Sequence, residues 1–187
     1  MWIRDTLPAR LPHVRFYIYG YDTSIAGSTS AQNVQDISGT LINTLEAYSL
    51  GTPNAKPLIF LAHSLGGVVL KQALVQVAKV AGNASELRSG IFDKIKGVIF
   101  FGVPSRPMPF ESLYSIVQEQ PNEGLVRDLT NKSEYLGVLE HEFSQILSLG
   151  TMTMFWAYET KMTRTVMVRF THTIVQSSTT VFSKLII

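Results

Sequence analysis

The sequence predicts an α/β fold in which a mostly parallel sheet is flanked by helices on both faces. Short apolar segments alternate with longer segments of helical periodicity, an order typical of parallel sheets. Hydrophobic residues make up 45% of the chain and charged residues 16%, a balance typical of globular proteins. At 187 residues the chain is long enough for a sizeable core, so we expect a single domain over residues 1–187.

The main elements are expected in the order β-α-β-α-β-α-β. Apolar and β-branched composition predicts strands at residues 14–19, 57–61, 96–103 and 151–158. Apolar residues at helical spacing predict helices at residues 34–48, 65–82 and 136–147, and a short one at 112–118. The region around Pro121 is expected to be a loop. Residues 166–170 and 173–176 are further candidate strands within a divergent C-terminal tail, residues 166–187.

Composition and charge exclude several classes of function. The net charge is +2 and the basic residues are scattered, so no nucleic-acid partner is expected. The absence of cysteine excludes disulfides, thiolate catalysis and cysteine zinc sites. No apolar run approaches the roughly 18 residues of a bilayer span, and residues 1–5 lack the apolar core of a signal peptide. The sequence by itself therefore predicts a cytoplasmic protein, and we expect no cofactor and no metal.

The candidate chemistry lies in residues 62–67 (AHSLGG), which approximate the pattern G-x-S-x-G. In that pattern a serine stands on a tight turn between an apolar strand and a helix. A serine hydroxyl is a weak nucleophile, and it needs a nearby base and donors that can hold an oxyanion. The turn forces strained backbone angles that lift the hydroxyl above the sheet. Since an apolar strand precedes and an amphipathic helix follows, Ser64 is the predicted nucleophile.

The neighbours of Ser64 are expected to support it. Ala62 and Gly66 must be small because strand and helix nearly collide at such a turn, and Gly67 adds clearance for the start of the helix. The backbone N–H of Leu65 is the predicted oxyanion donor, assisted by the positive end of the helix dipole. The alternative is that Ser64 is an ordinary helix N-cap, a position that favours serine.

Residues 60–74 (FLAHSLGGVVLKQAL) resemble a known family, the fungal branch of the α/β-hydrolases related to the serine-active-site-containing protein, which is lipase-like. Further markers occur in the family's order between residues 2 and 165, at residues 2–8, 19–22, 100–104, 121–122 and 158–161. The resemblance implies a partial α/β-hydrolase fold that acts on small-molecule or lipid esters of carboxylic acids. It also implies a place in the mitochondrion, the endoplasmic reticulum or peripherally on a membrane. In relatives the domain is part of larger multidomain receptors.

The sequence departs from the family in three places. Relatives carry a His-Gly-rich loop upstream that supplies a second oxyanion donor, whereas this chain begins at Met1. After residues 100–104 the family has His and then Gly, where this chain has Ser105 and Pro107. Relatives place the catalytic histidine after the last strand, and no histidine follows His172 here. We therefore expect a domain truncated at both ends, with weak or absent turnover.

The remaining triad members are assigned from the chain order Ser, acid, His that this fold uses. Glu159 directly follows the expected strand at residues 151–158 and matches a family marker, so it is the candidate acid. The alternative is that it is a solvated glutamate or an ion-pair partner. His172 alone among the four histidines follows Glu159 and is the candidate base; the alternative is an ordinary strand residue. His63 is expected to pack at the turn, because adjacent side chains diverge.

Two functions of different kinds remain open. The first is a serine ester hydrolase, favoured by the intact turn around Ser64. The second is a non-catalytic signalling or interaction module, or an incomplete gene product. The missing oxyanion loop and the missing distal histidine favour this second reading.

Overall fold

The computed structural model describes residues 5–24, 27–80, 86–106, 111–130, 133–147, 152–157 and 185–186. The helices are α2 (Leu7–Arg10), α3 (Val34–Ala47), α4 (Leu65–Val80), α5 (Glu86–Lys94), α6 (Glu111–Val117), α7 (Glu123–Asp128) and α8 (Tyr135–Leu147). The strands are β1 (Ile18–Tyr19), β2 (Leu58–His63), β3 (Ile95–Phe101), β4 (Thr153–Ala157) and β5 (Leu185–Ile186). They form a five-stranded sheet in the order β1-β5-β2-β3-β4.

The parallel part of the sheet is formed by β2, β3 and β4. The register pairs Phe60 with Val98 and Val98 with Met154, so that apolar side chains of the three strands lie in rows. β5 is antiparallel to both of its neighbours, β1 and β2. This arrangement, three parallel strands flanked by helices, agrees with the expected α/β class, and the other two pairings are antiparallel.

Most of the expected elements lie where the pattern placed them. α3, α4 and α8 correspond to the three expected long helices, and β2, β3 and β4 to the last three expected strands. The expected strand at residues 14–19 is shorter, because only Ile18 and Tyr19 pair with a neighbour. The loop expected around Pro121 was partly wrong, since α7 begins at Glu123. The candidate strands at 166–170 and 173–176 lie outside the described residues.

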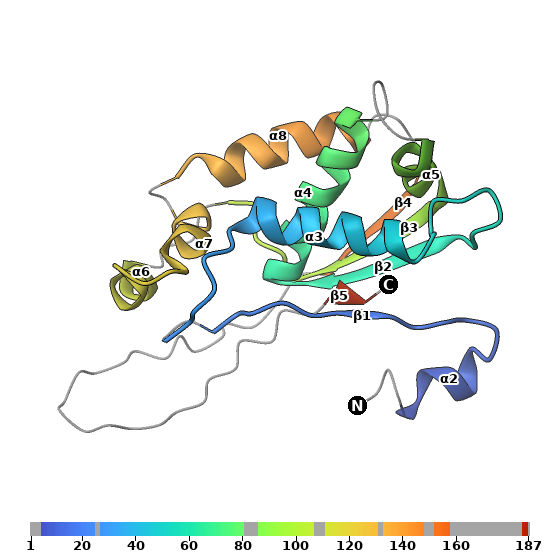
Figure 1. Cartoon of the computed structure of the whole chain (residues 1–187), viewed down its shortest axis with the longest axis horizontal. Helices are drawn as coiled ribbons and strands as arrows, with labels where there is room; N and C mark the ends of the chain where they lie inside the picture. The colour runs from blue at the N-terminus through green and yellow to red at the C-terminus, as the bar shows by residue number, and fades with distance from the viewer. Residues whose placement is uncertain are drawn as a thin grey trace.

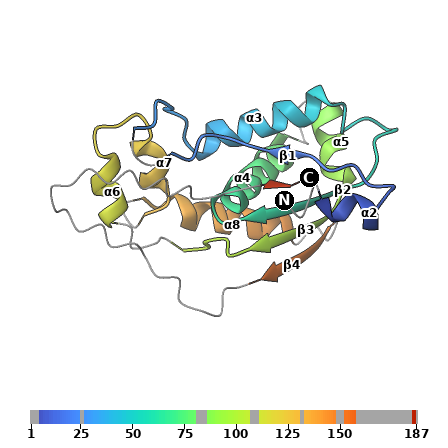
Figure 2. The same cartoon turned by 90° about the horizontal axis from the view of Figure 1, so that it is seen from below.

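The described long helices lie together over one face of the sheet (Figure 1). Phe60 and Phe100 point into this layer and are at most 1% exposed. On the opposite face Ile59 is 53% and Phe155 62% exposed, and Figure 2 shows β3 and β4 in front of the helix layer. The expectation of helices on both faces is therefore wrong for the described residues.

The order of the strands explains this one-sided layer. β1, β2, β3 and β4 follow one another in a single direction across the sheet. Crossovers between parallel strands are right-handed, so successive crossovers that step in one direction place their helices on the same face. From β1 to β4 the direction does not reverse, and α3, α4 and α8 consequently stack side by side; only β5 returns, to a place between β1 and β2.

α4 is the central helix of that layer. It contacts α3, α5 and α8 as well as β2, and Val68, Val69 and Leu70 are at most 1% exposed. Ser38 on α3 donates a hydrogen bond to the Val69 carbonyl at 2.9 Å, which joins the two helices. The N-terminus of α4 is thus held on several sides. No described helix is both long and apolar enough to cross a bilayer.

Candidate functional site

A single residue, Ser64, connects β2 to α4. The strand ends at His63 and the helix begins at Leu65. Ser64 has φ of 51°, in the left-handed region that residues with a Cβ seldom adopt. Its N–H donates to the Phe101 carbonyl at 3.0 Å, which extends the pairing of β2 with β3 by one residue. The backbone therefore turns sharply at a serine that stands at the carboxyl end of a parallel strand.

Two positions close to Ser64, Ala62 and Gly67, leave no room for larger side chains. Ala62 is fully buried beneath the helix layer. A Cβ built on Gly67 would lie 2.1 Å from Cγ2 of Val103, far inside normal contact. The requirement for small residues was predictable from the motif, but the residue that Gly67 approaches was not, because Val103 follows a different strand.

The start of α4 presents backbone donors next to Ser64. The first N–H groups of a helix have no carbonyl acceptor within it, and that of Gly67 donates to the Ser64 carbonyl at 2.9 Å. Leu65 is the first helical residue, as the oxyanion prediction requires. Ser64 is partly exposed, and His63 is exposed because it alternates with buried Ala62 along β2. The motif residues are thus gathered at one edge of the sheet.

The loop after β1 borders this edge and is tied down by Asp22. The Asp22 carboxylate accepts hydrogen bonds at 2.9 Å from the Ser24 N–H and from the Ser28 hydroxyl. The Ser24 bonds and the Ser28 bond lower the pKa of Asp22 below its ordinary value. Asn122 donates to the Ser24 carbonyl at 2.8 Å, which joins the loop to the start of α7. In Figure 1, α6 and α7 lie beyond the carboxyl ends of the strands.

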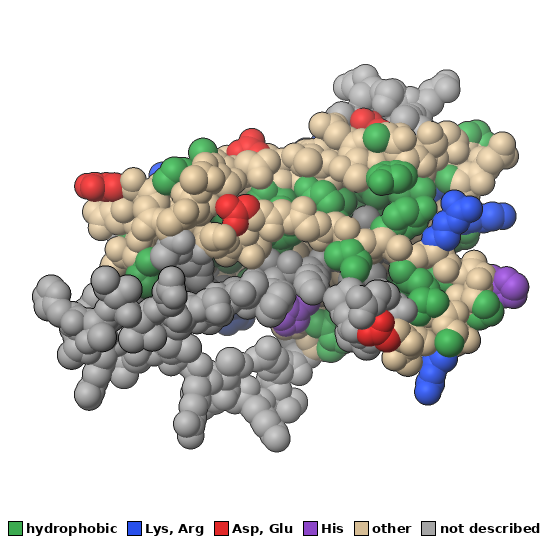
Figure 3. Space-filling view, turned by 60° about the horizontal axis from the view of Figure 1, so that its bottom comes forward, with side chains coloured by type: hydrophobic (Ala, Val, Ile, Leu, Met, Phe, Trp, Pro, Cys, Tyr) green, Lys and Arg blue, Asp and Glu red, His purple; other side chains and the backbone are tan. Residues whose placement is uncertain are grey.

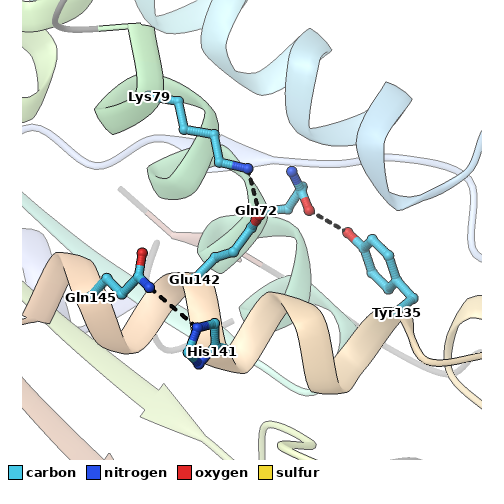
Figure 4. Close-up of polar contacts among 6 residues, drawn as sticks. All are labelled: Gln72, Lys79, Tyr135, His141, Glu142 and Gln145. Carbon is cyan, nitrogen blue, oxygen red and sulfur yellow. Dashed lines mark hydrogen bonds and ion pairs between the residues drawn. The ribbon is translucent and has the colours of Figure 1, made fainter.

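The candidate acid and base are not among the described residues. Glu159 and His172 both lie outside them, so their roles stay predictions. His13 is exposed before β1, and His141 is exposed on α8, where its ring lies 3.2 Å from the Gln145 amide (Figure 4). The structure therefore describes the turn that carries the predicted nucleophile and not the groups predicted to activate it.

A separate set of polar contacts joins α4 to α8 (Figure 4). Tyr135 donates to Gln72 at 2.6 Å and Lys79 pairs with Glu142 at 2.6 Å. A shallow hollow beside them is lined by Val75, Ala78, Lys79, Glu142, Gln145 and Ile146. Val75 is eleven helical positions beyond Ser64, about 16 Å along the axis at 1.5 Å per residue. This hollow therefore does not belong to the Ser64 site.

Fold and turn together define an α/β protein with a serine on a left-handed strand-to-helix turn. The chain is similar to Protein SERAC1 of Bos taurus and of Mus musculus, 27% identical over 108 residues in each. It is also similar to Protein SERAC1 of Danio rerio, 28% identical over 110 residues. The aligned segments cover 55% of this chain and 15% to 16% of the relatives, so this similarity is distant and partial. No protein-family model and no solved structure matches the chain.

Proposed function

We propose that the chain is a serine hydrolase of carboxylic esters in which Ser64 is the nucleophile. One observation carries the proposal: a partly exposed serine at φ 51° stands between a parallel strand and a helix N-terminus. An N-cap serine ordinarily has an extended backbone, so the left-handed angle argues against the capping alternative. The distant similarity to Protein SERAC1 supports the proposal.

In the proposed reaction the Ser64 oxygen attacks the ester carbonyl while a base removes its proton. The negative charge that develops on the carbonyl oxygen would be held by the N–H of Leu65 and by the positive end of α4. The tetrahedral intermediate then expels the alcohol, which takes up the proton, and water hydrolyses the acyl-serine to release the acid. Glu159 and His172 are the candidate acid and base of this proposal.

The finer parts of the proposal come from the sequence resemblance. They are an α/β-hydrolase fold of the fungal lipase-like branch, a small-molecule or lipid ester as substrate, and association with the mitochondrion, the endoplasmic reticulum or a membrane. A place within a larger multidomain protein belongs to the same proposal. The relatives found here are from vertebrates, and they are much longer than the segment they share with this chain.

A non-catalytic interaction module is the second candidate function. It is favoured by the segment after β3, where Ser105 replaces the family's histidine. The Ser105 hydroxyl accepts a hydrogen bond from a buried lysine, Lys71, at 3.5 Å, so this position has a structural contact of its own. A domain that kept the turn and lost its activating groups would retain the fold without turnover.

A fluorophosphonate probe distinguishes the two candidates, because it reacts with activated serines. We expect the wild-type protein to be labelled and Ser64→Ala not to be, with the modified peptide located by mass spectrometry. Ser49→Ala is the matched control, since Ser49 also has a positive φ, 55°, but lies exposed in the turn after α3. It should be labelled like the wild type.

The labelling experiment has a clear contrary outcome. A folded wild-type protein that stays unlabelled between about pH 6 and about pH 9, where an imidazole base is available, would support the interaction module. If labelling occurs, hydrolysis of p-nitrophenyl esters of increasing acyl length defines the substrate. Loss of the nucleophile should lower kcat by about a thousandfold or more.

A further inference from the structure

Lys71 lies completely buried in α4, with its side chain 0% exposed. Its ammonium group forms an ion pair with Glu140 of α8. It also lies 4.9 Å from the ring centre of Trp156 on β4 and 5.6 Å from those of Phe100 and Phe143. A cation within about 6 Å of an aromatic face is attracted by it. A single charge on the helix that follows Ser64 therefore contacts both the sheet and α8.

Burial of an ammonium group is unfavourable, and replacement of a buried ion pair by apolar residues is often neutral or stabilising. Desolvation lowers the pKa of Lys71, and the hydrogen bond and charge of Glu140 oppose that effect. Packing alone would be served by an unbranched apolar side chain of similar length, such as methionine. The charge at this position therefore calls for an explanation other than stability.

A further partner of Lys71, Ser105, supplies that explanation. The Lys71 ammonium group donates to the Ser105 hydroxyl at 3.5 Å, the long end of hydrogen-bonding range. Ser105 belongs to residues 102–106, the segment that leaves β3, and Val103 of the same segment is the side chain that Gly67 approaches. This segment is thus held against α4 by Lys71 on one side and lies against the Ser64 turn on the other.

We propose that Lys71 is a positioning residue, which holds residues 102–106 as a fixed wall beside Ser64. The inference rests on the proposed function, because the wall would shape the space that an ester occupies. Lys71 acts here through Ser105 and the backbone of the segment, and it does not contact Ser64. Glu140 and the three rings make the charge tolerable in that place.

The test compares Lys71→Met with Lys79→Met. Lys79 is on the same helix and also pairs with a glutamate of α8, but its side chain is 60% exposed and belongs to the other end of α4. We expect Lys71→Met to slow fluorophosphonate labelling of Ser64 tenfold or more without lowering the melting temperature. Lys79→Met should label within twofold of the wild type. Equal labelling rates in the two variants would overturn the proposal.

Amide hydrogen exchange gives a readout that does not depend on activity. Within residues 102–106, the Gly102 amide donates to the Ala157 carbonyl at 2.9 Å, and it should lose protection in Lys71→Met and keep it in Lys79→Met. If the wild type is never labelled, the ester-hydrolase proposal fails, and hydrogen exchange alone decides whether Lys71 fixes residues 102–106. Protection that is unchanged in Lys71→Met would then refute the positioning role of Lys71. If Lys71→Met does not fold, Ser105→Ala serves instead, because Ser105 is exposed. It should label several-fold more slowly, and an unchanged rate with unchanged exchange would refute the inference.

Discussion

Replacement of Ser64 by glycine tests whether the turn between β2 and α4 is strained. Ser64 has φ of 51°, and a residue with a Cβ in the left-handed region is less stable by about 1–2 kcal/mol than one in the right-handed region. Glycine removes that cost, although its more flexible unfolded chain offsets about 0.5–1 kcal/mol. We therefore expect Ser64→Gly to be more stable than Ser64→Ala by about 1 kcal/mol. In a chain of this length that difference raises the melting temperature by about 2–4 °C.

Thermal unfolding followed by circular dichroism measures the difference. Ser144 supplies the control, because it is exposed within the regular helix α8. There the order reverses, and Ser144→Gly should be less stable than Ser144→Ala by up to about 1 kcal/mol. If Ser64→Ala melts at or above Ser64→Gly, the turn is relaxed and the argument for an activated serine loses its basis. Both Ser64 variants also lose the nucleophile and should not be labelled. In Ser64→Gly, a gain in stability over Ser64→Ala would therefore accompany a loss of labelling.

Two further predictions follow from contacts near the site. Gly67→Ala should lower the free energy of unfolding by about 1–2 kcal/mol, because the new methyl group would lie 2.1 Å from Val103. In a double-mutant cycle, adding Val103→Ala should restore the lost stability. Gly137→Ala is the control, and it should not destabilise the protein because the space around Gly137 is open. The pKa of Asp22 is held below its ordinary 3.8, so the carboxylate stabilises the fold above about pH 3.8 and this contribution disappears as the pH falls through the lowered pKa. The difference in denaturation midpoint between wild type and Asp22→Ala should therefore shrink only in acid, and a difference that does not depend on pH would contradict the assignment.

The open face of the sheet has a consequence for handling the protein. Ile59, Phe101 and Phe155 expose 53%, 39% and 62% of their surface on that face, and Figure 3 shows hydrophobic side chains at the surface of the underside of the molecule. Exposed apolar groups on adjacent strands favour association in water. The sequence pattern could not reveal this face, because a strand buried on both sides and one buried on one side can have the same apolar composition.

Lys71 shows how a functional candidate escapes sequence reasoning. It lies in the middle of an apolar helix, which is a signal in itself, since α4 has almost no polar face to receive a charge. Its partners come from α8, from β3 and β4 and from the segment after β3. Nothing in the spacing along the chain relates these residues to one another.

Local pattern in the sequence determined the parallel strands, the long helices and the turn at Ser64, because each depends on residues that are neighbours along the chain. An apolar run, a serine with small residues two positions to either side and a run of helical length suffice for that unit. The tertiary structure alone decided the rest. It places Val103 against Gly67 and the ammonium group of Lys71 among three aromatic rings. It also inserts β5 between β1 and β2 and gathers the described long helices on one face of the sheet. These features arise where segments distant in sequence meet, and only the order and handedness of the connections bring them together.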